Sequence, residues 1–222
     1  MADNRIIIEG QPESVLATNK VLRNTYMLLS MTLVFSTVTA WVAIATQAQP
    51  MGFIPLLIGF YGLFFLTSKL SNSVWGLAST FALTGFMGYT LGPIVGFYLT
   101  MSNGPELVMT ALGMTAMVFL GLSGYALVSR KDFSFLAGFI TAGFFVLIGA
   151  MVVGFIWDIS GLSLAISAGF VLFSSAAILL QTGQIINGGE RNYIMATITL
   201  YVSIYNLFLS LLHILGVMGG DD

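Results

Sequence analysis

The chain has 222 residues, of which 57% are hydrophobic and only 7% are charged, with a net charge of −2. Soluble domains carry about a quarter charged residues, so this composition indicates an integral membrane protein. Seven Lys and Arg residues are too few for a nucleic-acid interface, and the lack of cysteine excludes disulfides and thiolate metal sites.

The polar residues 1–22 predict a cytoplasmic N-terminal tail that is disordered up to about residue 20, except for a strand-like run at 5–8. The tail lacks the apolar stretch of a cleavable signal peptide, so we expect the first hydrophobic helix to direct insertion. Apolar runs, each near the ~20 residues that cross a bilayer, follow at 24–47, 51–68, 74–99, 106–128, 133–156, 162–180 and 193–215. The sequence therefore predicts an all-α, seven-helix transmembrane domain over 23–216 and a short extracytoplasmic tail over 217–222.

The basic residues indicate the orientation of the chain. They all precede the first, third, fifth or seventh apolar run, at Arg5, Lys20, Arg23, Lys69, Arg130, Lys131 and Arg191. The other connecting segments and the C-terminal tail contain none. Under the positive-inside rule, the N-terminus is cytoplasmic and the C-terminus lies outside, in the periplasm of a bacterial cell.

Small residues recur at helical spacing in the third apolar run. Gly88, Gly92 and Gly96 are four residues apart, which predicts a face where another helix packs closely. Gly121 and Gly124 predict the same role in the fourth run. A hinge at Pro93, like the broken helices of transporters, is the alternative for the third run.

The seventh run carries a polar seam, which we define as Thr199, Ser203, Asn206, Ser210 and His213. Their spacing places them on one helix face, with two tyrosines, Tyr201 and Tyr205, on a neighbouring face. Unpaired polar groups facing lipid cost several kcal/mol. We therefore expect this helix in the middle of the bundle, with the seam hydrogen-bonded to its neighbours. A water-filled path along the seam is the alternative interpretation.

One motif suggests an enzyme. Gly121-Leu122-Ser123-Gly124 resembles the motif of rhomboid intramembrane proteases, with His213 as a candidate base. The predicted topology separates Ser123 and His213 by roughly 20 Å in depth, too far for proton transfer. One histidine and acids dispersed over both membrane faces supply no set of metal ligands. The sequence therefore predicts neither catalysis nor a metal or other cofactor.

Two segments carry a family resemblance. The stretch 181–216, QTGQIINGGERNYIMATITLYVSIYNLFLSLLHILG, resembles the C-terminal end of the Bax-inhibitor family, and 84–99, TGFMGYTLGPIVGFYL, resembles its middle segment. The resemblance implies six helices around a central C-terminal seventh. It further implies an inner-membrane protein that binds the membrane-anchored, ATP-dependent protease FtsH, alone or with its associated membrane proteins. Such a protein modulates the protease negatively, chiefly toward membrane substrates.

The same resemblance offers a second function, a pH-sensitive calcium or ion leak. Members with that activity use a pair of aspartates in the last two helices. The matching positions here are Gln181 and Ser203, which neither titrate nor carry charge. The sequence therefore favours the protease modulator over the leak channel.

Overall fold

The computed structural model describes residues 11–157, 159 and 161–219 of the chain. Seven helices make up most of this part, and all seven are long and apolar enough to cross a membrane. They are α1 (Gln11–Ala45), α2 (Phe53–Leu70), α3 (Trp75–Leu99), α4 (Gly104–Ser129), α5 (Leu136–Ile156), α6 (Leu162–Ile186) and α7 (Tyr193–Gly219). The predicted seven-helix fold is confirmed.

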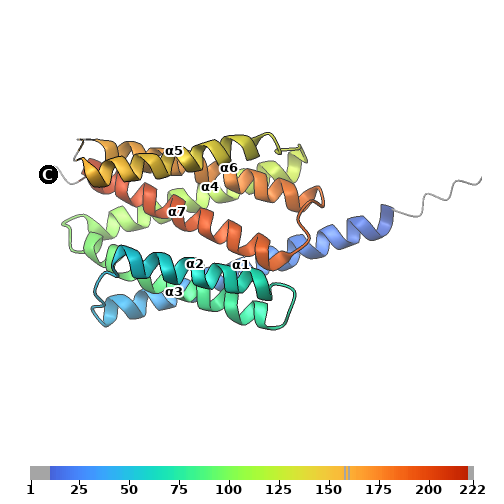
Figure 1. The fold of residues 1–222 in the computed structure, drawn as a ribbon, viewed down its shortest axis with the longest axis horizontal. Coiled ribbons are helices and arrows are strands. Elements are labelled where there is room, and N and C mark those ends of the chain that lie inside the picture. The colour runs from blue at the N-terminus through green and yellow to red at the C-terminus, as the bar shows by residue number, and fades with distance from the viewer. Residues whose placement is uncertain (1–10, 158, 160, 220–222) are drawn as a thin grey trace, which may run out of the picture.

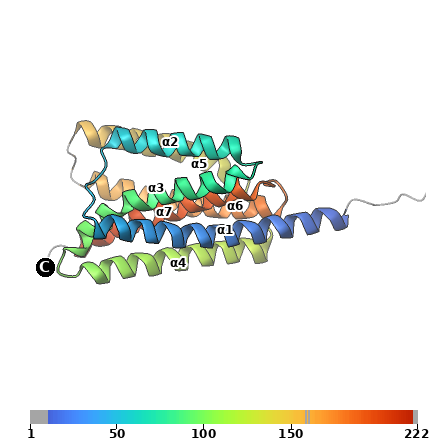
Figure 2. The same ribbon diagram turned by 90° about the horizontal axis from the view of Figure 1, so that it is seen from below.

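The first helix is longer than its apolar run. It begins at Gln11, so the expected disorder is wrong for residues 11–20, whereas the strand-like segment at 5–8 lies outside the described residues. The start of α1 extends beyond the ends of the other helices (Figures 1 and 2). The polar residues here therefore belong to a part of the helix that extends beyond the bundle. They do not mark where the helix begins.

The last two helices also exceed their predicted ends. α6 continues to Ile186 instead of stopping near residue 180, because the polar residues Gln181 and Thr182 are buried among other helices. α7 continues to Gly219, beyond the predicted end of the domain at 216. The apolar run of α6 ends before Gln181, because the sequence does not show that neighbouring helices cover the polar residues that follow.

The central position of α7 is confirmed. It runs diagonally between α1–α3 and the pair α5 and α6 (Figure 1). Its packing partners are chiefly α6, α4 and α1, with α3 making a smaller contact. In the most apolar window of each helix, 56% of residues are buried in α7 but only 6% in α2 and in α5. The two outer helices lie on the same side of the bundle, α2 on α3 and α5 on α6 (Figure 2).

The glycines of α3 lie against α1. A Cβ atom added at Gly88 would overlap the carbonyl oxygen of Ser36, and one at Gly92 would lie 2.7 Å from the carbonyl oxygen of Ala40. A Cβ at Gly96 would make only an ordinary contact, 3.8 Å from the side chain of Ile44. The α1 and α3 backbones can approach this closely only because two of these positions lack a side chain.

The close packing expected at Gly121 and Gly124 is not found among the described helices, and α3 is not broken at Pro93. A Cβ at Gly121 or Gly124 would meet nothing within 4 Å, so these glycines make no close helix contact within the structure. α3 runs without interruption through Pro93, so the helix does not break there. The spacing of the two glycines in α4 predicts a packed face, but no described helix covers that face.

The contact between α1 and α3 makes a prediction about stability. Gly88→Ala would push a methyl group into the α1 backbone, and we expect a loss of about 1–3 kcal/mol in the free energy of unfolding. The matched control is Gly121→Ala, which meets open space and should leave stability unchanged or raise it by up to about 1 kcal/mol. Reversible denaturation in detergent micelles measures both. Equal stability of the two variants would contradict the close approach of α1 and α3.

Candidate functional site: the polar faces of the central helix

The buried polar face of α7 ties this helix to α1 and α3. The Tyr201 hydroxyl donates to the carbonyl oxygen of Thr84 on α3 at 3.2 Å and lies 2.6 Å from Ser36 Oγ on α1. Since the single hydroxyl hydrogen of Tyr201 is used toward Thr84, the hydroxyl of Ser36 donates to Tyr201. One turn earlier, the Thr197 hydroxyl lies 3.3 Å from the carbonyl oxygen of Thr25 on α1, and its shorter hydrogen bond, at 2.7 Å, goes to the carbonyl oxygen of Tyr193 in its own helix. These bonds fix the rotation of α7 about its own axis.

The predicted seam lies on a different face, and its residues divide into two groups. Ser203 and Ser210 are buried, whereas Thr199, Asn206 and His213 are partly exposed. Ser203 donates to the carbonyl oxygen of Thr199 within the same helix, at 2.8 Å.

Only His213 joins the seam to another helix within the described residues. Its Nδ1 lies 2.9 Å from Ser167 Oγ on α6. The side chain of Asn206 makes no hydrogen bond to any described residue. The seam therefore contributes little to holding the bundle together, and Tyr201, which the sequence placed beside the seam, does more.

The positions of the missing acid pair are close to the bundle interior. Gln181 and Ser203 are each 6% exposed, and the Nε2 of Gln181 has no hydrogen-bond partner in the described part of the chain. Neither side chain carries a charge, so these two positions cannot share a proton as a pair of acids would. This region has no group able to respond to pH by that route.

The suspected catalytic pair is not assembled. Ser123 is 2% exposed, and its hydroxyl has no partner among the described residues. His213 instead lies beside Ser167, near the other end of the bundle. No group of three or more His, Asp or Glu residues that could hold a metal ion occurs in the described residues.

The loop before α7 is organised by Asn192. Its side-chain oxygen accepts hydrogen bonds from the backbone N–H groups of Ile194 and Met195, at 3.0 and 3.1 Å, and so caps the helix. Its Nδ2 donates to the Oδ1 of Asn72 in the α2–α3 connection at 3.1 Å. Sequence analysis missed this role, although an asparagine shortly before a long apolar run is a recognisable N-cap pattern.

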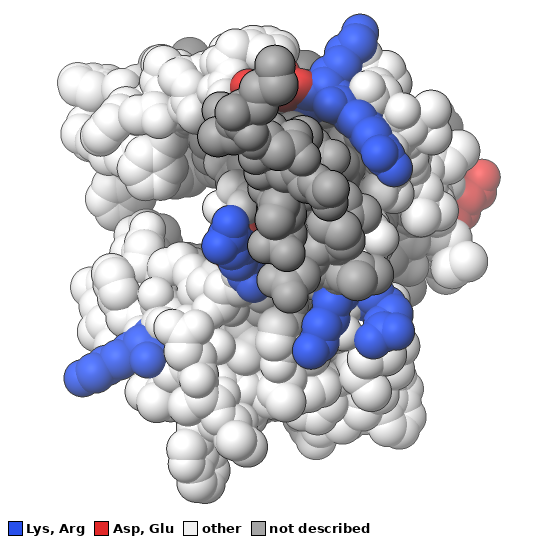
Figure 3. All heavy atoms as spheres, turned by 90° about the vertical axis from the view of Figure 1, so that its right-hand side faces the viewer, with Lys and Arg blue, Asp and Glu red and all other residues white. Residues whose placement is uncertain are grey.

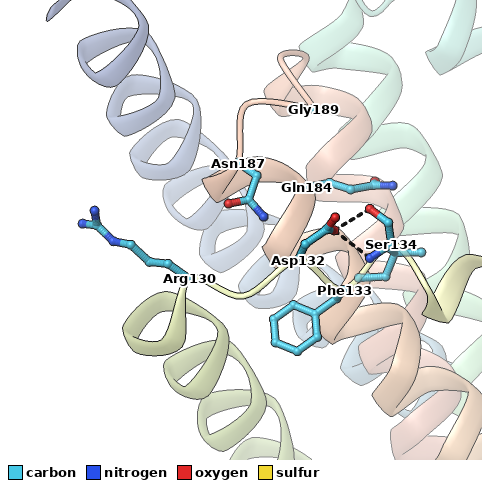
Figure 4. Close-up of a pocket in the computed structure, with 8 residues that line it drawn as sticks. Arg130, Asp132, Phe133, Ser134, Gln184, Asn187 and Gly189 are labelled. Atoms are coloured by element: carbon cyan, nitrogen blue, oxygen red, sulfur yellow. Dashed lines mark hydrogen bonds between the residues drawn. The ribbon is translucent and has the colours of Figure 1, made fainter. Parts of the chain in front are cut away.

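A polar pocket lies at the same end of the bundle, between the α4–α5 connection and the end of α6 (Figure 4). Its volume is about 250 Å³, and it is lined by Arg130, Asp132, Phe133, Ser134, Leu180, Gln184, Asn187 and Gly189. Asp132 accepts a hydrogen bond from the backbone N–H of Ser134 at 2.8 Å and another from its hydroxyl. These bonds lower the pKa of Asp132. The Arg130 side chain points away from Asp132 (Figure 4), so the two do not form an ion pair in the pocket.

The described basic residues gather at this end (Figure 3). They lie on the first turns of α1, at the end of α2, in the α4–α5 connection and before α7, at Lys20, Arg23, Lys69, Arg130, Lys131 and Arg191. Glu106, in the first turn of α4, lies at the opposite end. The charge asymmetry expected from the sequence is present among the described residues.

Comparison with known proteins agrees with this architecture. The family model described as "Inhibitor of apoptosis-promoting Bax1" matches residues 18–220. The chain belongs to the Bax-inhibitor family. The match covers all of the apolar helix segments and includes both α6 and α7, which carry the predicted C-terminal motif.

Relatives are similar along nearly their whole length. An uncharacterized protein of Pseudomonas aeruginosa is 66% identical over 202 residues, which is 91% of each chain. The "Modulator of FtsH protease YccA" of Escherichia coli K12 is 52% identical over 208 residues, 94% of each chain. The "Inner membrane protein YccA" of Escherichia coli O6:H1 shows the same identity and coverage. Together with the apolar helices, these relatives indicate a multi-pass inner-membrane protein. One of them is named as a modulator of a protease.

The Tyr201 contacts can be tested by removing one oxygen atom. In this Bax-inhibitor family member, Tyr201→Phe would leave Ser36 Oγ buried without its acceptor, and we expect a loss of about 1–2 kcal/mol in unfolding free energy. Tyr61→Phe is the matched control, because the Tyr61 side chain is 43% exposed and makes no hydrogen bond to a described residue. Denaturation in micelles compares the two. If both variants unfold like the parent, the Tyr201 hydroxyl does not hold α7 in place.

Proposed function

We propose that the protein binds an FtsH-type protease in the inner membrane and lowers its activity, chiefly toward membrane substrates. The observation that supports this most directly is the 52% identity, over 94% of both chains, with a relative named as a modulator of FtsH. The Gln181 and Ser203 positions favour this function over an acid-pair ion leak.

The charge distribution supports an orientation for this complex. We propose that the basic end of the bundle faces the cytoplasm, so that the N-terminus is cytoplasmic and the C-terminus periplasmic. The start of α1 then projects into the cytoplasm beyond the other helices. In the proposed orientation, the start of α1, from Gln11, is on the same side of the membrane as the ATPase part of the protease.

The packing of the bundle supports a mechanism for inhibition. α3 is held against α1 by glycine contacts, and α7 is fastened to both by the Tyr201 hydroxyl. A protease that grips the N-terminal segment must extract α1 first, against these contacts. Slow extraction keeps the protease occupied, and other membrane substrates then wait longer for degradation.

Purification of the tagged protein from its own membranes in mild detergent tests the binding. We expect near-stoichiometric recovery of the membrane-anchored protease by mass spectrometry. In proteoliposomes, added protein should slow degradation of a membrane substrate more than that of a soluble one. The proposed function is wrong if the protein is recovered without the protease and leaves both degradation rates unchanged.

Deletion of residues 3–17 tests the role of the N-terminal segment separately. It keeps the apolar part of α1, from Thr18 to Ala45, and the basic residues Lys20 and Arg23 that favour the same orientation. We expect normal insertion but several-fold weaker inhibition of the protease, because the projecting turns are gone. Full inhibition by the inserted deletion variant would show that the protease does not need this segment.

A further inference from the structure

One sector of the central helix is not covered by another helix. Around α7 stand α1, α3, α4 and α6, and among the described residues neither α2 nor α5 packs extensively on α7 or on the other. Because α2 lies on α3 and α5 on α6, both on one side of the bundle, they flank the open sector between α3 and α6 (Figure 2). The space-filling view along the bundle shows a hollow on this side, at the left of Figure 3. We call it the lateral groove.

The floor of the lateral groove is a single stripe of α7. Six residues of this helix are partly exposed at successive spacings of four and three, which places them on one face. They are Met195, Thr199, Val202, Asn206, Leu209 and His213. Three of the six belong to the polar seam, so the seam runs along the border of the groove.

Asn206 is a polar residue of the groove whose side chain has no hydrogen-bond partner among the described residues. It is the middle residue of α7, which extends from Tyr193 to Gly219, so its amide lies near the centre of the bilayer. The amide is partly exposed and makes no hydrogen bond to a described residue. An amide carries two N–H donors and a carbonyl acceptor, and acyl chains can satisfy none of them.

The chemistry of this position selects one kind of occupant. At mid-membrane depth, the groups that can bond to an amide are side chains or exposed carbonyls of another transmembrane helix. On one side of Asn206 in the stripe, Val202 and then Thr199 have small or thin side chains, which allow such a helix to approach closely there. α7 has 27 residues, about 40 Å of helix, so the groove is as long as a transmembrane segment.

We propose that the lateral groove binds one transmembrane helix of the partner protease, with a polar group near the middle of that helix bonded to Asn206. This inference rests on the proposed function, because the protease supplies the helix. It assigns the contact to α7 and its flanking helices and not to the exposed outer face of α4. The polar seam is then an interface that is completed only in the complex.

Photo-crosslinking locates the contact. A photoreactive benzoyl-phenylalanine at Met195 or Leu209, where the native side chain is already large, should crosslink the protein to the protease in native membranes. The same residue at Met117, which is 69% exposed on α4, is the matched control and should not. Crosslinks from Met117 but not from the groove positions, or groove crosslinks only to lipid or to a second copy of the chain, overturn the inference.

Substitution of Asn206 measures what the amide contributes. Asn206→Leu should lower the affinity for the protease roughly three- to tenfold, the size of effect expected for one interhelical hydrogen bond. Asn206→Gln keeps an amide and should retain more binding, and Thr141→Leu, at an exposed position on α5, should change nothing. Thermal unfolding in detergent checks that each variant is folded.

The two proposals fail differently. If the parent protein binds the protease but Asn206→Leu, when folded, binds it equally well, the groove inference is wrong and the proposed function stands. A bulkier variant, Val202→Phe, gives a second test. It should lower the affinity for the protease by blocking the groove, without removing a polar group. If the parent protein does not bind the protease at all, both the proposed function and the groove inference are wrong.

Discussion

The Tyr201 hydroxyl lies where α1, α3 and α7 meet, and it bonds to both neighbouring helices. A hydroxyl buried in this position cannot hydrogen-bond to water, so its hydrogen-bond partners must come from the protein. Because the bond to Thr84 uses a backbone carbonyl, it holds α7 at one height and one rotation against α3. The positions of the seam and of the open sector both follow from that rotation.

The packing is uneven around this point. α1 and α3 approach each other closely at Gly88 and Gly92, whereas only 6% of residues in the most apolar windows of α2 and α5 are buried. Apolar surface gives little drive for association within lipid, so a helix without small residues or hydrogen bonds at its contact is held weakly. The bundle therefore combines a firm inner set of helices with two outer ones that border the lateral groove. The proposed function draws on both parts, since the firm inner set would resist extraction and the groove would offer a surface to a partner.

The family relationship and the polar groups together narrow the function. Membership in the Bax-inhibitor family leaves a membrane modulator and an ion leak as candidates. The uncharged Gln181 and Ser203 remove the titrating pair on which the leak depends. Within the seam, Asn206 lies at the middle of α7 with an amide that has no partner among the described residues, which suits binding to another helix better than proton or calcium movement. The pocket near Asp132 lies at the basic end of the bundle.

The number of spans, the charge asymmetry and the family were determined by the sequence alone, because hydrophobicity, basic residues and local motifs are properties of the chain itself. The central place of α7 was also predictable, since polar residues such as Ser203 and Ser210 cannot face lipid. Tertiary structure decided which polar residues meet a partner: Tyr201 reaches two helices, His213 one, and Asn206 none that is described. It also separated Gly88, which packs, from Gly121, which does not. Spacing places residues on one face of a helix, but only the neighbouring helices determine whether that face is covered.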